Sequence, residues 1–171
     1  IKAWARLKEE TVGFELLFMG KGTDEYEQYL HKLVDDLHLK NVSFLGMVTG
    51  EDKFKRLTSM RVLCVPSKTE NFGMTVAEAL IAQTPVICTK TAPWEELNTR
   101  HCGWWVDNDI DTLAQTIRVA LLLPQSEIDK MGENGKLLIE TNYTDTQIAL
   151  KMKQLYEWIL TGGEKPEFVY E

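Results

Sequence analysis

Two glutamates, Glu70 and Glu78, stand eight positions apart in the sequence TENFGMTVAEA at 69–79. The residues around Glu78, from Val76 to Ala82, carry no other charge, which is typical of a buried helix. A carboxylate is almost never fully buried unless something pairs with it. Carboxylates accept hydrogen bonds from neutral hydroxyl groups, each worth about 1.5–3 kcal/mol. The two glutamates could therefore bind hydroxyl-rich groups, and the alternative for each is a solvated surface side chain.

The segment between the glutamates predicts a phosphate site. The apolar run VLCVPS at 62–67 predicts a strand, and KTENFG then leads into a predicted helix at 73–83. Asn71 is the expected N-cap, and Gly73 lets another group approach the backbone closely. The unpaired N–H groups of such a helix start suit a phosphate. A sugar at the first glutamate and a ribose at the second would then flank a diphosphate, whereas Phe72 is expected to be a packing residue.

Apolar runs alternate with helical patterns along most of the chain. Nearly every residue of these runs is apolar, which is typical of a parallel sheet covered on both faces. We therefore predict one α/β domain over residues 1–171, a Rossmann-like doubly wound parallel sheet in three α/β/α layers with C-terminal helices. In such sheets ligands bind outside the carboxyl ends of the strands. The predicted strands are 15–20, 42–46, 62–67, 84–89 and 103–106, and the predicted helices are 23–39, 51–59, 73–83, 110–122, 125–141 and 145–161.

Both ends of the chain have helical patterns. KAWARLKEE at 2–10 predicts an opening helix, although alternating α/β domains usually begin with a strand. We therefore favour a first strand missing upstream of Ile1 over a genuine start in residues 1–14. In the last helix one apolar stripe should pack on the domain, and a membrane role for it has weak support. That stripe consists of Ile148, Met152, Leu155 and Ile159, and GGEKP at 162–166 predicts a loosening tail.

The composition excludes several classes of function. No apolar run approaches the roughly 20 residues that span a bilayer, and the start of the chain has no secretory signal. The net charge of -7 argues against a nucleic-acid binder, which would need a basic face. The three cysteines lack metal-ligand spacing, and Cys64 and Cys88 fall in apolar runs where they act as small hydrophobes. A reducing cytosol is the expected location. The histidines, His31, His38 and His101, are expected at the surface.

The stretch Asp107-Asn108-Asp109 formally matches a D-x-D metal-binding motif. It lies just before the predicted helix at 110–122, where Asp and Asn are preferred as helix caps. We therefore interpret these residues as caps and predict no metal site.

Residues 70–78, followed by Ala79-Leu80 and Pro85-Val86-Ile87, resemble the E-x7-E signature of the retaining GT-B glycosyltransferases of family 4. The resemblance extends in order over nearly the whole chain, through LLFMGKG, VSFLGMV, VPSKTENFG, Gly103 and the terminal YEWIL. It implies the C-terminal, donor-binding domain of a two-domain enzyme. Such an enzyme transfers a sugar from a nucleotide diphosphosugar to a hydroxyl acceptor with retention, without metal or cofactor, in polysaccharide or glycolipid synthesis.

The resemblance also implies roles for individual residues. Glu70 would be the catalytic-site glutamate that binds the donor sugar's hydroxyls, and Glu78 would hold the ribose. The backbones of Asn71, Phe72, Gly73 and Met74 would line the sugar and phosphate site. Main-chain groups of Val48, Thr49 and Gly50 would meet the base, with Lys53 close by. Gly20 and Gly22 would line the cleft that faces the acceptor domain.

The chain also departs from the family. The family's first strand carries an Arg and a Lys that neutralise the diphosphate, and nothing before Ile1 supplies them here. Gln83-Thr84 replace the small residue and glycine that are common before the proline. We therefore expect a fragment that binds nucleotide sugar weakly, transfers no sugar alone and needs an unseen N-terminal domain. Peripheral association of the full enzyme with the inner face of the membrane is left open. A sugar-nucleotide epimerase and a non-catalytic binding or scaffold domain remain as alternatives.

Overall fold

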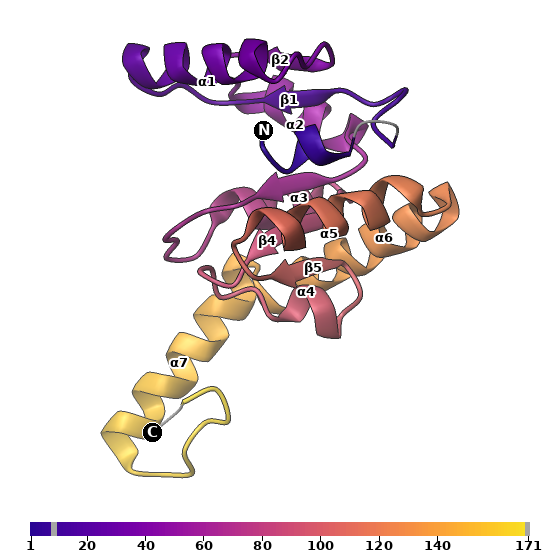
Figure 1. Cartoon of the computed structure of the whole chain (residues 1–171). Helices are drawn as coiled ribbons and strands as arrows, with labels where there is room; N and C mark the ends of the chain where they lie inside the picture. Colours follow the sequence, from indigo (N-terminus) through magenta and orange to yellow (C-terminus); the bar gives the residue numbers. More distant parts are fainter. Residues whose placement is uncertain (8–9, 170–171) are drawn as a thin grey trace.

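The structure, a computed structural model, describes residues 1–7 and 10–169 of the chain (Figure 1). Five strands alternate with helices, as the sequence predicts. The strands are β1 Leu16–Phe18, β2 Val42–Phe44, β3 Leu63–Val65, β4 Val86–Thr89 and β5 Gly103–Val106. The helices are η1 Trp4–Arg6, α1 Asp24–Asp36, α2 Gly50–Ser59, α3 Met74–Ile81, α4 Glu96–Thr99, α5 Ile110–Leu122, α6 Gln125–Asn142 and α7 Asp145–Thr161.

All strand pairs are parallel, and they form two hydrogen-bonded parts. β1 pairs with β2 in the register Leu16↔Val42, and β4 lies between β3 and β5 with Ile87 opposite Cys64 and Trp104. Within the described residues, β1 and β3 share no ladder hydrogen bonds, although they edge the two facing parts of the sheet. The predicted parallel sheet is thus confirmed, with a break between β1 and β3.

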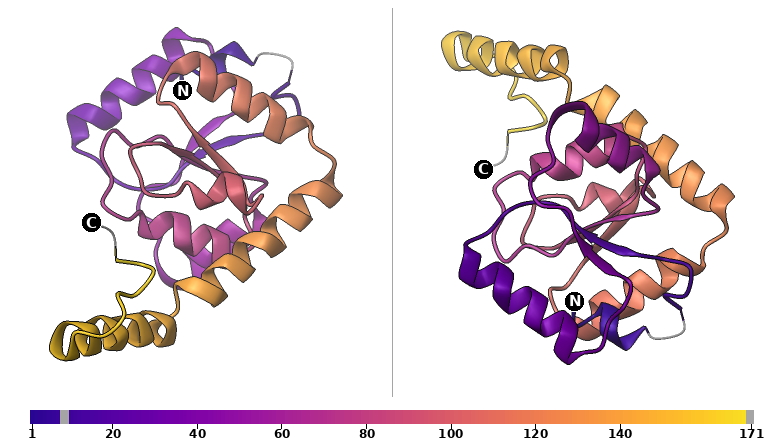
Figure 2. Two further views of the ribbon diagram at one scale, coloured as in Figure 1. Left: turned by 90° about the horizontal axis from the view of Figure 1, so that it is seen from below. Right: turned by 90° about the horizontal axis from the view of Figure 1, so that it is seen from above.

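The helices cover both faces of the sheet, which confirms the three-layer architecture. Along β4, Val86 and Cys88 point into a core built with α2, α3, α4 and α6. Between them Ile87 points to the other face, where η1 and α5 complete a second core. This alternation follows from the two-residue period of a strand. Figure 2 shows α1 and α5 on one side of the sheet and α3 and α6 on the other.

The predicted opening helix is wrong in extent. Only Trp4–Arg6 is helical, as a single 3-10 turn, and Lys8 and Glu9 of the predicted helix lie outside the described residues. The turn ends at Leu7, where the backbone leaves helical geometry with φ -102° and ψ 29°. Trp4 and Leu7 are both buried, in the core that also receives Leu16 of β1 and Cys64 of β3. The opening residues therefore join the two parts of the sheet through apolar packing.

The predicted packing of the last helix on the domain is also wrong. α7 begins and ends at the predicted residues, but none of its residues is buried. Ile148, Met152 and Ile159 of the expected stripe are exposed by 43%, 41% and 64%. Figure 1 shows α7 projecting away from the sheet, and after Gly162 the chain is irregular, as predicted. None of the described helices is long and apolar enough to cross a membrane.

Candidate functional site

The predicted site residues gather at the edge formed by the carboxyl ends of the strands. Gly20 and Gly22 follow β1, and Val48, Thr49, Gly50 and Lys53 lie after β2, at the start of α2. The segment 70–74 follows β3 and opens α3, the helix that carries Glu78. Parallel strands place all these loops on one edge, so the fold collects residues that are far apart in sequence.

The start of α3 differs from the prediction in its cap. Gly73, not Asn71, is the N-cap residue, with a left-handed backbone at φ 84° and ψ 63°. Asn71 cannot cap the helix because it stands two residues before the point where the chain turns. A side chain at Gly73 would be crowded as well as strained, because its Cβ would lie 3.2 Å from the Trp94 indole nitrogen. Gly73 is therefore required by conformation and by close packing.

Several backbone N–H groups are left open at this helix start. The Gly73 carbonyl accepts from the N–H of Val76 at 2.8 Å, as in an ordinary first turn. Among the described residues, no acceptor is found for the N–H groups of Gly73, Met74 and Thr75. Open N–H groups at the positive end of a helix bind anions, so the predicted phosphate site has the required donors.

Glu70 lies beside these donors. Its side chain is half-buried, and its carboxylate accepts a hydrogen bond from the Asn71 N–H at 3.2 Å. A Cβ at Gly73 would be 3.3 Å from Glu70 Cγ. The pKa of the Cys88 thiol at the end of β4 is raised to about 11, mainly by burial and further by the nearby Glu70 charge. Glu70 thus stands between α3 and the end of the central strand.

Glu78 has a charged partner, and the sequence did not predict this pairing. Its carboxylate forms a hydrogen-bonded ion pair with the ammonium of Lys53, on the first turn of α2. The prediction of a buried environment is wrong, because 40% of the Glu78 side chain is exposed. α3 buries Val76, Ala79 and Leu80 on one face only, and Glu78 lies off that face. The pair therefore joins α2 and α3, which the family resemblance assigns to the base and the ribose. It leaves part of the Glu78 carboxylate accessible to solvent.

We predict a small but measurable coupling between Lys53 and Glu78. Because solvent screens this partly exposed pair, a double-mutant cycle of Lys53→Ala and Glu78→Ala should give about 0.2–1 kcal/mol in urea unfolding. The exposed pair of Lys55 and Glu51, with a 3.6 Å separation, serves as a control and should couple less. A coupling of zero for the first pair would contradict the geometry.

A shared hydrogen-bond acceptor fixes the loop that precedes Glu70. The carbonyl of Ser67, just after β3, accepts from Thr89 Oγ1 and Thr91 Oγ1 at 2.7 Å each and from Asn108 Nδ2 at 3.0 Å. Thr89 ends β4, Thr91 follows it and Asn108 follows β5, so one carbonyl joins the ends of three neighbouring strands. Sequence reasoning missed these residues, because their only signal is a polar residue at each strand end.

The glycine loops on the β1 and β2 side are linked to each other. The Gly20 N–H donates to the Gly46 carbonyl at 2.8 Å, and the Gly22 N–H donates to Glu27 Oε1 at 2.9 Å. Gly50 begins α2 with φ 58°, and Thr49 is its N-cap residue without a side-chain cap bond. The backbones of Gly20, Gly22, Thr49 and Gly50 are exposed and Val48 is half-buried, which suits main-chain contacts.

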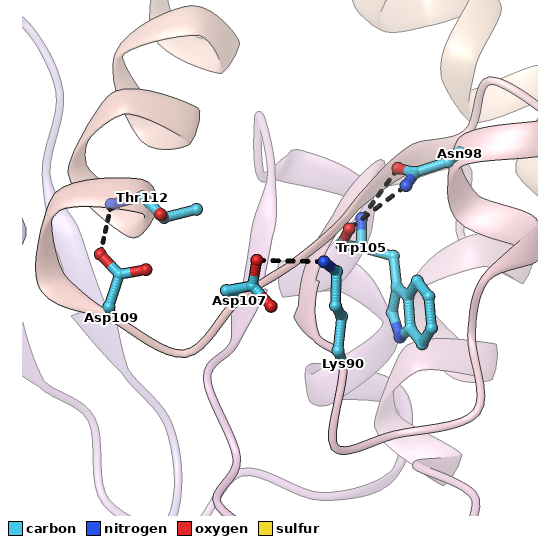
Figure 3. Close-up of polar contacts among 6 residues, drawn as sticks. All are labelled: Lys90, Asn98, Trp105, Asp107, Asp109 and Thr112. Atoms are coloured by element: carbon cyan, nitrogen blue, oxygen red, sulfur yellow. Dashed lines mark hydrogen bonds and ion pairs between the residues drawn. The ribbon is translucent and has the colours of Figure 1, made fainter.

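In the D-x-D stretch Asp109 is confirmed as the predicted helix cap, whereas Asp107 is not a cap (Figure 3). Asp109 is the N-cap of α5 and accepts from the Thr112 N–H at 2.8 Å. Asp107 pairs instead with the Lys90 ammonium at 3.0 Å. Asn98 exchanges two hydrogen bonds with the Trp105 backbone beside them. Each side chain of the stretch thus holds a different neighbour.

The cap at Asp109 should make stability depend on pH. Hydrogen bonds from Thr112 lower the pKa of Asp109 below its ordinary value of 3.8 in the folded protein. Its charge therefore contributes stability above pH 3.8, and the contribution is lost as the pH falls through the lower folded value. Asp109→Asn should reduce the urea midpoint near neutral pH, and the difference from the parent should shrink in acid. A difference that grows in acid would contradict this assignment.

The remaining predicted features play no part in the site. Burial raises the pKa of the Cys102 thiol to about 11 and that of Cys64 to about 12, in keeping with small apolar groups. His31 lies against the Phe44 ring at 4.1 Å, and His101 is exposed. Two surface hollows in the described part of the chain, along α7 with its tail and around His101, contain no predicted site residue.

Comparison with known proteins identifies the family of this chain. The family described as "Glycosyl transferases group 1" matches residues 1–138, and the chain therefore belongs to it. The chain is 27% identical to an alpha-1,3/1,6-mannosyltransferase of Neurospora crassa, over 95% of its own length and 41% of the relative's. The chain thus spans about two fifths of that protein.

Solved structures show the same GT-B type of fold. An Anabaena protein, HepE, solved with UDP and glucose, superposes with a TM-score of 0.74 at 18% identity, over 91% of this chain and 42% of that one. The C-terminal domain of a group 1 glycosyl transferase from Francisella tularensis superposes with a TM-score of 0.72 at 22% identity. That match covers 84% of this chain and 77% of the other.

Proposed function

We propose that this chain is the C-terminal, donor-binding domain of a retaining glycosyltransferase of family 4. The complete enzyme would transfer a sugar from a nucleotide diphosphosugar to a hydroxyl acceptor in polysaccharide or glycolipid synthesis. One observation carries the proposal, namely that Glu70, the open start of α3 and Glu78, which pairs with Lys53 of α2, follow one another along the segment 70–78 after β3. Membership of the group 1 family and the nucleotide-bound Anabaena neighbour support it.

Each part of the arrangement has a chemical task in this proposal. The diphosphate binds the N–H groups of Gly73, Met74 and Thr75, whose partial positive charge is suited to it. Glu70 accepts hydrogen bonds from the sugar hydroxyls at the reacting end of the donor. Glu78, oriented by Lys53, accepts from the ribose hydroxyls, while the backbone of 48–50 meets the base. The phosphate charge is then balanced without a metal ion by donors fixed before the reaction.

The experiment is sugar transfer by the complete protein, with the anomeric configuration of the product measured by NMR. We expect retention, and activity that survives addition of EDTA. Residues 1–171 alone should bind the donor weakly and transfer nothing. An inverted product would overturn the retaining mechanism, and substantial turnover by residues 1–171 would overturn the division between donor and acceptor domains.

The epimerase and scaffold alternatives give different results. An epimerase would convert the nucleotide sugar in the absence of an acceptor. A scaffold would be unaffected by Glu70→Ala or Glu78→Ala in its biological role. No specific contact in the described residues favours either alternative. We place the complete enzyme in the cytoplasm, with peripheral association at the inner membrane face.

We also propose that a strand upstream of Ile1 lies between β1 and β3. The acceptor domain would precede that strand in the chain. All three residues of β1 and of β3 are only half-buried, whereas the whole of β4 is buried. Ile1 lies near Cys64 of β3. Figure 1 shows the N-terminus between the two parts of the sheet.

Extending the chain upstream by its natural sequence tests this arrangement. The inserted strand should raise the urea midpoint and slow hydrogen exchange of amides in 16–18 and 63–65, because both edges gain ladder hydrogen bonds. The amides of β5, far from the break, serve as the internal control. Unchanged exchange at both inner edges would contradict the proposed insertion.

A further inference from the structure

We propose that Trp94 is a positioning residue of the donor site, which fixes the Phe72–Gly73 peptide so that its N–H faces the phosphate. This inference rests on the proposed function and adds to it a residue outside the E-x7-E stretch. Trp94 is wholly buried. Its indole N–H donates a hydrogen bond to the carbonyl of Phe72, immediately before the helix-capping glycine.

The direction of this hydrogen bond decides the direction of the next N–H group. In a planar trans peptide the C=O of one residue and the N–H of the next point in opposite directions. The Phe72 carbonyl points to the buried indole, so the Gly73 N–H points away from it. No acceptor for this N–H is found in the described part of the chain, which leaves it for a ligand.

Two aromatic rings, those of Phe72 and Tyr143, hold the indole in place. Phe72 and Trp94 have ring centroids 5.1 Å apart, and Tyr143 lies 5.6 Å from Phe72 and 5.3 Å from Trp94. The Tyr143 hydroxyl donates to Glu96 of α4, which also accepts a weak bond from Asn142 at 3.5 Å. The donor loop is thus held against the junction of α6 and α7 rather than by its own residues alone.

The space at Gly73 shows how closely this support is fitted. A Cβ there would lie 3.2 Å from the Trp94 indole nitrogen and 3.3 Å from both Glu70 Cγ and Val76 Cγ2. The indole, the catalytic-site glutamate and the first turn of α3 therefore meet around one glycine. A shift of the indole would move the peptide whose N–H is proposed to meet the phosphate.

The test measures the affinity of the complete protein for UDP, GDP and ADP by isothermal titration calorimetry. The affinities for the corresponding nucleosides, which lack the diphosphate, are measured in the same way. Trp94→Phe keeps an aromatic ring and removes the indole N–H. We expect diphosphate affinity to fall by about 2- to 12-fold, the equivalent of one neutral hydrogen bond, with nucleoside affinity unchanged. Tyr143→Leu, which keeps the indole bond but removes its supporting ring, should give a smaller loss of the same selectivity.

Trp105→Phe is the matched control. It removes the same kind of bond, from an indole N–H to the Ala92 carbonyl at 2.7 Å, without touching Phe72. Its diphosphate affinity should stay within about twofold of the parent, since no contact with the donor loop is lost. The inference would be overturned if Trp94→Phe and Trp105→Phe lost equal affinity for the diphosphates. It would also be overturned if a variant lost equal affinity for diphosphate and nucleoside, or if Trp94→Phe or Tyr143→Leu lost no diphosphate affinity. Failure of the parent protein to bind any of the three diphosphates would instead overturn the proposed function.

Discussion

Replacing Glu70 by alanine should lower kcat/KM of the complete enzyme by roughly 100-fold or more, with little change in stability. In the proposed site this carboxylate accepts at least two hydrogen bonds from the donor sugar, and each bond to a charged group is worth about 1.5–3 kcal/mol. The folded protein itself uses the carboxylate for little, because its contact is one 3.2 Å bond from the neighbouring Asn71 N–H. Steady-state kinetics and urea unfolding of the same variant measure the two effects.

Glu51→Ala is the control for this variant. Glu51 lies in the first turn of α2, after strand β2, and it pairs only loosely with Lys55 at 3.6 Å. This variant also loses one negative charge near the edge of the sheet. Its kcat/KM should stay within about twofold of the parent value, because a surface ion pair contributes little free energy. If Glu51→Ala reduced activity as much as Glu70→Ala, general electrostatics would explain the loss and the assigned contact would be wrong.

Gly132→Ala, far from the proposed chemistry, should cause a large loss of stability. Gly132 lies on α6 where this helix meets the end of α3, and a Cβ there would be 2.2 Å from the carbonyl oxygen of Gln83. The obstacle is backbone in a constrained turn, since Gln83 itself has φ 61°. Overpacking of this kind costs about 1–3 kcal/mol or more, which exceeds the gain of up to about 1 kcal/mol in helix propensity. Urea unfolding of residues 1–171 measures the difference.

Gly135→Ala on the same helix separates overpacking from propensity. Its Cβ would meet Leu80 Cδ2 at 2.8 Å, the end of a side chain that can turn away. The same propensity gain applies, so this variant should lose clearly less stability than Gly132→Ala. A Gly132→Ala variant as stable as the parent would show that α3 and α6 do not approach as closely as described.

The elements governed by local patterns could be predicted from the sequence. α5 and α7 begin and end at the predicted residues, because their caps are side chains of Asp109 and Thr144 whose effect is local. β5 also has its predicted bounds, at Gly103–Val106. The gathering of the site residues at one edge follows from the alternation of strands and helices alone. These features need no knowledge of which residues meet across the fold.

The features that depend on distant contacts could not be predicted. Asn71 has the type of a good N-cap, but the left-handed turn at Gly73 is set by the Trp94 indole packed against it. The ion pair of Lys53 and Glu78 joins two helices, and no sequence pattern relates them. The apolar spacing of α7 correctly indicated a helix, but the prediction that its stripe packs on the domain was wrong, because local spacing does not show what a helix face contacts.

The central claim is that the start of α3 binds a diphosphate between Glu70 and Glu78. The most direct measurement is a crystal structure of the complete protein with whichever of a UDP-, GDP- or ADP-sugar binds tightest. We expect the phosphates within hydrogen-bond distance of the Gly73 and Met74 N–H groups, the sugar on Glu70 and the ribose on Glu78. A donor bound elsewhere, for example in the hollow around His101, with both carboxylates left in solvent, would contradict the claim.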